Sequence, residues 1–396
     1  TVVLHTPGDL DIGQEALQRA LHGTSWEIYA RNLSNKDNNL TVKGDFTAQL
    51  SGWFNNTGGT LWAGEHLTIV QSTPGATTGQ RTGQGTGLLS LNNHHGQIAA
   101  PRVVIKMPQV DNPGGQILGD QVSIEAQTLT NRVGSPGGVI AARQALHLGV
   151  KELENGAHAL LYSQGDLSIG GALDENNQAV GVAQTISNTG GMIDAHGKVV
   201  AQARTITNGQ GATVLAGHTV LWPKEALNND ANSQVITGDF LLETDRFTNT
   251  GRLEARTIAM TVNHFDNVGK LVRADQHLQL QGKGPESTLD NRQGLLLSAG
   301  SLALKFDRFD NTQGTVLAAG DGDVHIGQML GSGRWILGGK LELHTPGSWT
   351  QGTDALMDAG HLDLRVGSLY NQGGVYGDTV SLEAPKIHNQ GGVIAA

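Results

Sequence analysis

The sequence contains no cysteine among its 396 residues. The protein can therefore form no disulfide bond and no thiolate metal site. The absence of cysteine does not by itself place the protein inside a cell, because it also suits a long chain that crosses a membrane unfolded.

Positive charge and apolar runs are also scarce. The 26 Lys and Arg residues are scattered, and with 36 Asp and Glu they leave a net charge of −10. This balance argues against nucleic acid and anionic membrane surfaces as partners. No apolar run reaches the roughly 18–20 residues of a membrane-spanning helix, and residues 1–4 (TVVL) begin in a strand pattern rather than a secretion signal.

Glycine is abundant, and the glycines belong to a repeat. The chain has 56 glycines, roughly twice the usual share, while aromatic residues make up only 4%. Residues 184–200 (QTISNTGGMIDAHGKVV) are followed twenty residues later by a similar stretch, 204–221 (RTITNGQGATVLAGHTVL). Each copy has a short apolar run ending in Asn, a Gly turn, an apolar stretch and a final alternating strand.

Such a unit cannot bury its apolar face alone, so copies of it must stack. Three strand-length pieces leave no room for a helix of normal length. We therefore predict an all-β fold, a right-handed parallel β-helix (β-solenoid) of about 20 residues per coil with loop insertions. At a spacing of about 4.8 Å, roughly 20 coils would extend on the order of 95 Å. We expect residues 1–396 to form one continuous solenoid, with less regular coils in 1–111 and regular repeats in 112–396.

The Asn of each repeat predicts a structural ladder. Asn tolerates left-handed turns, and stacked Asn side chains can hydrogen-bond along the stack. The predicted ladder residues are Asn112, Asn131, Asn155, Asn188, Asn208, Asn249, Asn267, Asn291, Asn311, Asn371 and Asn389.

Several stretches interrupt the repeat. The apolar spacing in 14–22 predicts a short helix, and the Thr-, Gly- and Gln-rich stretch 72–87 predicts a protruding, mobile loop. Wider gaps predict insertions at 170–184, 222–233 and 282–287. The final residues 391–396 (GGVIAA) match 137–142 without the strand that follows the earlier copy. We therefore expect an internal fragment of a longer array.

Candidate chemical sites are few. The pair His94–His95 lacks the carboxylate of a zinc motif, so solvated turn histidines are the favoured interpretation. Residues 174–177 (DENN) and 321–323 (DGD) match a calcium loop only loosely and favour polar turns. The Gly-rich stretch 79–87 has no GK[ST] element, which argues against a phosphate site. No GxSxG element is present.

These observations predict no catalytic residue, no metal and no cofactor. A carbohydrate-active β-helix would need carboxylates clustered on one face, and here they recur at no single position of the repeat. Trp62 and Trp335 lie in strand patterns that predict packed or half-covered rings. Trp222 lies in a predicted insertion, where loop packing is favoured over an exposed binding anchor. The candidate receptor contacts are Arg81, His94, His95, Asp174 and Trp222.

The repeat resembles a known family. Residues 289–302 (LDNRQGLLLSAGSL) and 309–320 (FDNTQGTVLAAG) resemble the repeats of filamentous haemagglutinin and of contact-dependent growth inhibition effectors. Residues 160–174 (LLYSQGDLSIGGALD) look like a segment common in those effectors. The resemblance implies two-partner secretion through an outer-membrane pore of a Gram-negative bacterium, folding outside the cell, and a cell-surface filament that carries a toxin elsewhere.

Three functions remain in view. The first is a non-enzymatic rod of an adhesin or growth-inhibition effector whose insertions at 71–96, 170–184 and 222–233 bind a protein or glycan receptor on a target cell. The second is a purely structural spacer without a binding site. The third, a carbohydrate-active β-helix enzyme, would require a row of acidic side chains along one groove.

Overall fold

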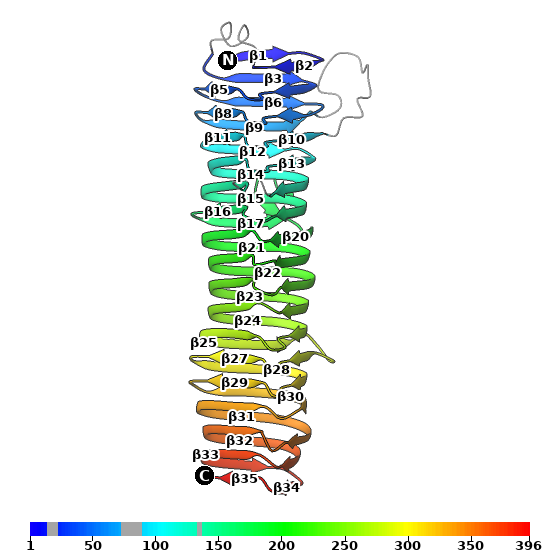
Figure 1. The fold of residues 1–396 in the computed structure, drawn as a ribbon, viewed down its shortest axis with the longest axis vertical. Coiled ribbons are helices and arrows are strands. Elements are labelled where there is room, and N and C mark those ends of the chain that lie inside the picture. Colours follow the sequence, from blue (N-terminus) through cyan, green and yellow to red (C-terminus); the bar gives the residue numbers. More distant parts are fainter. Residues whose placement is uncertain (14–22, 73–88, 133–136) are drawn as a thin grey trace. The chain divides into compact units, whose positions relative to one another are not determined.

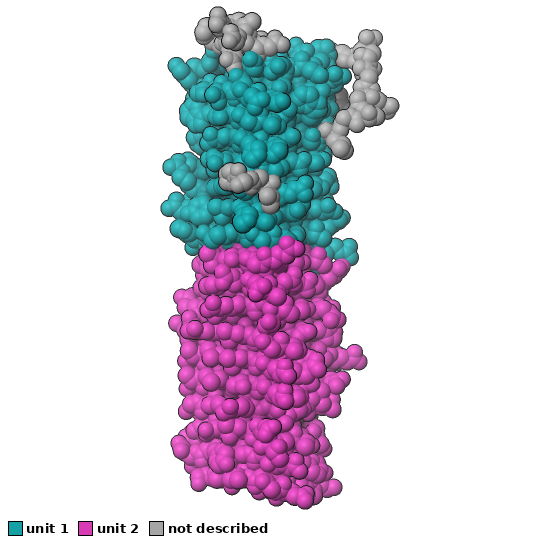
Figure 2. Space-filling view, viewed as in Figure 1, with its two compact units in different colours: residues 1–204 teal, residues 205–396 magenta. Residues whose placement is uncertain are grey.

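A computed structural model describes residues 1–13, 23–72, 89–132 and 137–396. The described chain divides into two compact units, Thr1–Arg204 and Thr205–Ala396 (Figure 2). The helix predicted at 14–22 and nearly all of the loop predicted at 72–87 lie outside the described residues.

Both units are built from stacked β coils (Figure 1). Along one side of the first unit, β3 (Trp26–Ala30) pairs in parallel with β6 (Phe46–Leu50), and β6 pairs with β9 (His66–Gln71). The described residues contain only strands, turns and bends, arranged as about 18 turns of about 20 residues. The predicted all-β solenoid and its period are confirmed.

The remaining strands of the first unit are β1 (Val2–His5), β2 (Asp9–Asp11), β4 (Asn32–Ser34), β5 (Asn39–Val42), β7 (Phe54–Asn55), β8 (Thr60–Ala63), β10 (Ser90–Asn92), β11 (Gln97–Ala99), β12 (Arg102–Lys106), β13 (Gln109–Asp111), β14 (Gln116–Asn131), β15 (Val139–Asn155), β16 (Leu160–Ser163), β17 (Asp166–Gly170), β18 (Ala172–Leu173), β19 (Ala179–Val180) and β20 (Ala183–Thr189). Strand β21 (Met192–Gly209) begins in the first unit and ends in the second.

The other strands of the second unit are β22 (Thr213–Asn229), β23 (Gln234–Asn249), β24 (Arg252–Asp266), β25 (Leu271–Gly282), β26 (Thr288–Asp290), β27 (Leu295–Ser298), β28 (Ser301–Asp310), β29 (Thr315–Ala318), β30 (Gly322–Leu330), β31 (Arg334–Gln351), β32 (Leu356–Asn371), β33 (Gly374–Glu383), β34 (Ile387–Asn389) and β35 (Val393–Ala395).

The core is a narrow interior filled by alternate residues of each strand. In β6 the side chains of Phe46, Ala48 and Leu50 point inward and are completely buried. Since every coil repeats this alternation, equivalent apolar side chains stack from one coil to the next. The rings of Phe247 and Phe265, for example, lie parallel with centroids 4.9 Å apart. Burial of these columns is the main stabilising contribution, at about 25 cal/mol per Å².

Buried asparagines form a row beside this core in each unit. In the first unit each Asn Nδ2 donates to the Oδ1 of the Asn one coil later, over 2.7–2.9 Å. The row comprises Asn35, Asn56, Asn93, Asn112, Asn131, Asn155 and Asn188. Its members are at most 1% exposed, so each bond is shielded from water.

The second unit has a similar row with one interruption. Bonds of 2.8–3.0 Å connect Asn208, Asn229, Asn249, Asn267, Asn291 and Asn311, and a separate bond connects Asn371 to Asn389. Because Asp310 pairs with Leu330, Gly331 follows at the level of Asn311. The buried Asn311 Nδ2 and the buried Gln351 Oε1 have no hydrogen-bond partner in the structure. We call residues 330–335 the ladder gap.

The turn after each ladder Asn has its own geometry. Among the described residues, positive φ occurs two positions after the Asn in many coils, as at Asp37 (51°), His95 (52°) and Gln293 (59°), and not at the ladder asparagines themselves. The expectation that the Asn occupies the left-handed turn is therefore wrong. The Asn is buried to bond along the stack, and the residue beyond it makes the reversal.

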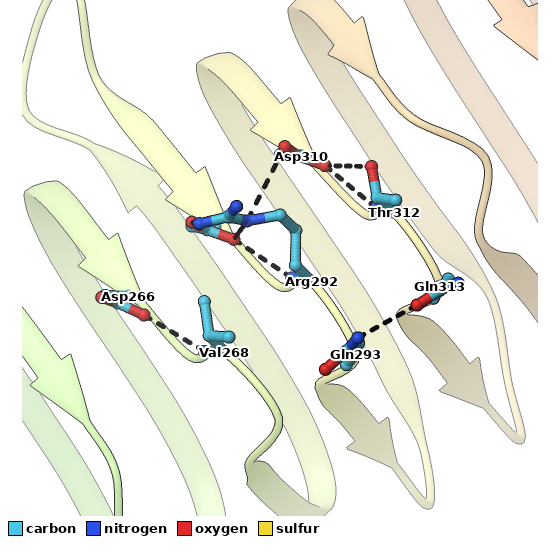
Figure 3. A network of polar contacts seen from close by, with 8 residues as sticks. Asp266, Val268, Arg292, Gln293, Asp310, Thr312 and Gln313 are labelled. Atoms are coloured by element: carbon cyan, nitrogen blue, oxygen red, sulfur yellow. Dashed lines mark hydrogen bonds and ion pairs between the residues drawn. The ribbon is translucent and has the colours of Figure 1, made fainter.

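The residue before the ladder Asn closes the same turn. Asp266, Asp290 and Asp310 are in register on successive coils, and each accepts a hydrogen bond from the backbone N–H two residues later (Figure 3). The Arg292 guanidinium also pairs with Asp290 and approaches Asp310 (3.9 Å). The short side chain of Asp suits this local bond.

The structure revises the predicted insertions. Residues 170–184 form a hairpin in which β18 and β19 pair antiparallel. Residues 283–287 separate β25 from β26 and are a true insertion. The insertion predicted at 222–233 is wrong, because β22 continues to Asn229 with one register shift between Leu221 and Ala226. The wide gap before Asn249 arose from overlooking Asn229.

Candidate functional site: a groove on the first unit

One outward-facing column of the first unit holds two aromatic rings. Strands β8, β11, β14, β15 and β16 stack on successive coils (Figure 1). Their register places Trp62, Ala99, Leu118, Ala141 and Tyr162 in line. Four steps of about 4.8 Å separate the two rings by about 19 Å. Since the three side chains between them are smaller, the rings stand above the floor at both ends.

This column forms the floor of a surface groove of about 380 Å³. We call it the Trp62–Tyr162 groove. Trp62 is 41% exposed, and the neighbouring backbone adds Gly119 and Pro101 to the lining. The backbone favours glycine at position 119, because a Cβ there would lie 2.8 Å from the carbonyl oxygen of Ala100. The column between the two rings therefore carries no aromatic side chain, and Leu118 is its largest residue.

One ion pair borders the groove. Arg143 Nε donates to Asp120 Oδ1 over 2.5 Å, and the terminal guanidinium nitrogen contacts the same oxygen. The Asp120 side chain is 26% exposed and the Arg143 side chain 74%. The two charges cancel locally, while the remaining guanidinium N–H groups and the second carboxylate oxygen stay available to hydrogen-bond a ligand.

Tyr162 is oriented by a neighbour from β21. The rings of Tyr162 and His196 meet edge to face, with centroids 5.7 Å apart, and the Tyr162 hydroxyl lies 3.5 Å from His196 Nε2. This contact limits rotation of the ring and holds the hydroxyl at the end of the groove. The site therefore offers two apolar ring faces and a small set of hydrogen-bonding groups, which is the usual composition of a ligand-binding cleft.

The groove does not provide the pair of carboxylates that glycoside hydrolysis uses. Asp120 is the single carboxylate in its lining, and Arg143 already occupies it. A retaining or inverting glycosidase uses two carboxyl groups that flank the scissile bond. The lining of this groove therefore does not match the arrangement of either class of glycosidase.

The residues proposed from sequence lie elsewhere. His94 and His95 are exposed and stacked, with centroids 4.5 Å apart, in the turn that follows the ladder residue Asn93. Asp174 accepts backbone hydrogen bonds from Asn176 (2.8 Å) and Gln178 (2.9 Å) at the tip of the β18–β19 hairpin. These contacts agree with polar turns, and Arg81 lies outside the described residues.

The tryptophans differ in part from expectation. Trp335 is completely buried and Trp62 is 41% exposed, so the first ring is packed and the second half-covered, as predicted. Trp222 is 38% exposed and lies on β22 of the second unit, not in an insertion. The alternation of the strand did not reveal how small the neighbours of Trp62 on adjacent coils are.

The polar turn predicted over the second loosely calcium-like stretch, 321–323, is wrong for its last two residues, because Gly322 and Asp323 begin β30. Asp321 Oδ1 accepts a hydrogen bond from the Lys340 backbone N–H (2.8 Å), and Asp323 pairs with His325 (2.9 Å). One group of three side chains in the described part of the chain could hold a metal ion: Asp45, Glu65 and His66. His66 Nδ1 lies 2.7 Å from Asp45 Oδ1, so these two groups already satisfy each other.

No helix long and apolar enough to cross a membrane occurs among the described residues. The fold defines a class of protein, a parallel β-solenoid whose successive coils are connected by a buried Asn ladder. The haemagglutinin-repeat family model matches residues 9–73, 84–193, 170–284, 267–328 and 336–396. The chain belongs to the haemagglutinin-repeat family.

A curated relative shares part of this repeat region. Deoxyribonuclease CdiA of Dickeya dadantii (strain 3937) is 28% identical over 160 residues, which is 39% of this chain. The matched region spans only 4% of that protein's length. No solved structure matches the chain. The similarity to a CdiA protein agrees with the resemblance inferred from residues 160–174.

Proposed function

We propose that this chain is a segment of a secreted bacterial surface filament, of the adhesin or contact-dependent growth inhibition type, that presents a receptor-binding surface to a target cell. The family assignment and the similarity to a CdiA protein support the filament. The observation that carries the binding role is the exposed Trp62–Tyr162 groove. The filament would leave its cell through an outer-membrane secretion pore.

On a solenoid fold, few residues are needed to form a binding groove. Parallel coils place equivalent side chains about 4.8 Å apart, so an outward column needs only two large rings and small residues between them. The buried Asn ladder holds the register of the coils beneath, which fixes the distance between the rings. Neither catalysis nor a cofactor is needed for this role.

The test is binding of the fluorescently labelled chain to intact Gram-negative cells. We expect saturable binding that falls at least tenfold when Trp62 and Tyr162 are both replaced by Ala. Trp222→Ala is the matched control, since it removes an equally exposed tryptophan (38%) from the second unit. Circular dichroism checks that each variant keeps its β signal.

A purely structural spacer is the second candidate function. The continuous Asn row of the first unit, and the regular coils it supports, favour that role. Absence of saturable binding by the unmodified chain would contradict the receptor-binding proposal and support the spacer. Equal loss of binding in the Trp222→Ala control would contradict the assignment to the groove.

A further inference from the structure

The shape of the Trp62–Tyr162 groove restricts the class of ligand. The strands beneath it are already paired on both sides, since β11 hydrogen-bonds to β8 and to β14, and β15 to β14 and β16. An extended peptide therefore finds no free backbone donors or acceptors on which to add a strand. A folded protein partner would need roughly 800 Å² of contact per side, much more than this groove provides.

The rings at both ends favour a ligand with flat apolar faces. Trp62 presents its ring to solvent, and Tyr162 presents a ring whose hydroxyl lies beside His196. Tyr and Trp combine a large apolar face with a polar edge. Sugar rings have the matching pattern, with C–H groups on their faces and hydroxyls on their edges. The floor of Ala99, Leu118 and Ala141 leaves room for rings between the two ends.

The ion pair decides the charge of that ligand. Asp120 already neutralises Arg143, and both are polar residues of the lining. An anionic ligand would have to displace Asp120 from the guanidinium, and a cationic ligand would meet Arg143. Uncharged vicinal hydroxyls can instead accept from the free guanidinium N–H groups and donate to the free carboxylate oxygen without breaking the pair.

We propose that the Trp62–Tyr162 groove binds a neutral oligosaccharide of several hexose units that lies across the coils. Its terminal rings stack on Trp62 and Tyr162, and hydroxyls between them hydrogen-bond with Asp120 and Arg143. This proposal rests on the receptor-binding function proposed above and specifies the chemistry of the receptor.

The direct test is to titrate the full chain with neutral hexose oligosaccharides of two to six units and to measure their binding by calorimetry. We expect affinity to rise with length until the ligand spans both rings. Trp62→Ala should weaken the binding of the longest ligand at least tenfold, and Tyr162→Phe should weaken it less because the ring remains. Trp222→Ala should leave it unchanged. A sulfated oligosaccharide of equal length should bind more weakly than the neutral one.

Cell binding separates this proposal from the broader one. Periodate oxidation cleaves the vicinal diols of cell-surface glycans, so pretreated cells should lose groove-dependent binding, whereas protease-treated cells should keep it. If periodate-treated cells bind normally and protease-treated cells do not, the receptor is a protein and the glycan proposal is wrong while the receptor-binding function stands. If untreated cells show no binding, the receptor-binding function itself fails.

Discussion

Replacing Asn267 by Leu should show how much the Asn row contributes to the coils of the second unit. Asn267 is completely buried, accepts from Asn249 Nδ2 (2.8 Å), and donates to Asn291 Oδ1 (2.9 Å) and to the Lys270 carbonyl oxygen (3.0 Å). Leu branches at the same carbon as Asn but is larger, so the hydrogen bonds are lost and the neighbouring side chains must shift to admit it. Three lost bonds and the buried groups they leave behind should cost about 3–5 kcal/mol.

The loss should be local. In a repeat array each coil contacts only its neighbours, so stability is approximately a sum of coil and interface contributions. Hydrogen exchange followed by mass spectrometry should show protection in β24 and β25 falling by more than about 100-fold, since about 1.4 kcal/mol corresponds to a factor of ten. Strands β32 and β33 should keep their protection.

The matched control is Asn263→Leu, four residues earlier in β24. Asn263 Nδ2 donates to Asp245 Oδ1 (2.6 Å) at the surface, where water can replace the partner. Its loss should change stability by no more than about 0.5 kcal/mol. Equal protection in the two variants would refute the view that the hydrogen bonds of the Asn row stabilise the coils because they are buried.

The variant Asn267→Asp tests the same reasoning through pH. An ionised Asp would place a buried negative charge against the acceptor Asn291 Oδ1, so its pKa should rise in the folded state. A protonated Asp can donate to that oxygen as the amide does. Since the folded state then binds the proton more tightly, stability should fall as pH rises above about 4, the unfolded value. A pH-independent loss in urea titrations would contradict this account.

Three further predictions concern the turns and the second unit. Gly294→Ala should lower the urea midpoint, because the new Cβ would lie 2.4 Å from the Asn267 carbonyl oxygen. The control Gly284→Ala should leave the midpoint unchanged, because no atom lies within 4 Å of its new Cβ. Equal midpoints in the two variants would refute the steric argument. The hydrogen bond from Arg256 holds the pKa of Asp239 below its usual value. Asp239→Asn should therefore lower the urea midpoint at pH 7, and the decrease should become smaller as the pH falls toward 2. An equal decrease of the midpoint at both pH values would exclude the ion pair as its cause. Amides of the ladder gap should exchange faster than those of the preceding coil, because the Asn311 donor before the gap and the Gln351 acceptor after it lack partners. Equal rates would show that the row adds nothing to protection at the turn.

The repeat was readable from sequence because its signals are local. A run ending in Asn, a small turn and an alternating strand recur within about 20 residues, and both the coil and the bonding of successive asparagines follow from that spacing. Asn35, Asn56, Asn93 and Asn229 were missed, although Asn56 and Asn93 begin the same Asn-x-x-Gly turn as the predicted ladder residues. Asn229 follows Leu227 in a run like the others, so the apolar–x–Asn signal was present there.

Other features required the register between coils. The sequence could not show that the residue two positions after the Asn, rather than the Asn itself, takes the left-handed conformation in many coils. It also suggested an insertion at 222–233, where the structure has a continuous strand with one register shift. In both cases the information that the sequence lacks is the packing and register of one coil against the next.

The sequence by itself determined the fold class, the period and the family, because each depends on residues close together in the chain. Only the tertiary structure decided the binding site. Trp62 and Tyr162 are one hundred positions apart, and whether they border one groove depends on the register of the intervening coils and on the small size of the residues between them. In a solenoid the turns are formed by residues that are neighbours in the chain, so the sequence reveals them. The strands pair with other coils, so a site that spans several coils is revealed only by the tertiary structure.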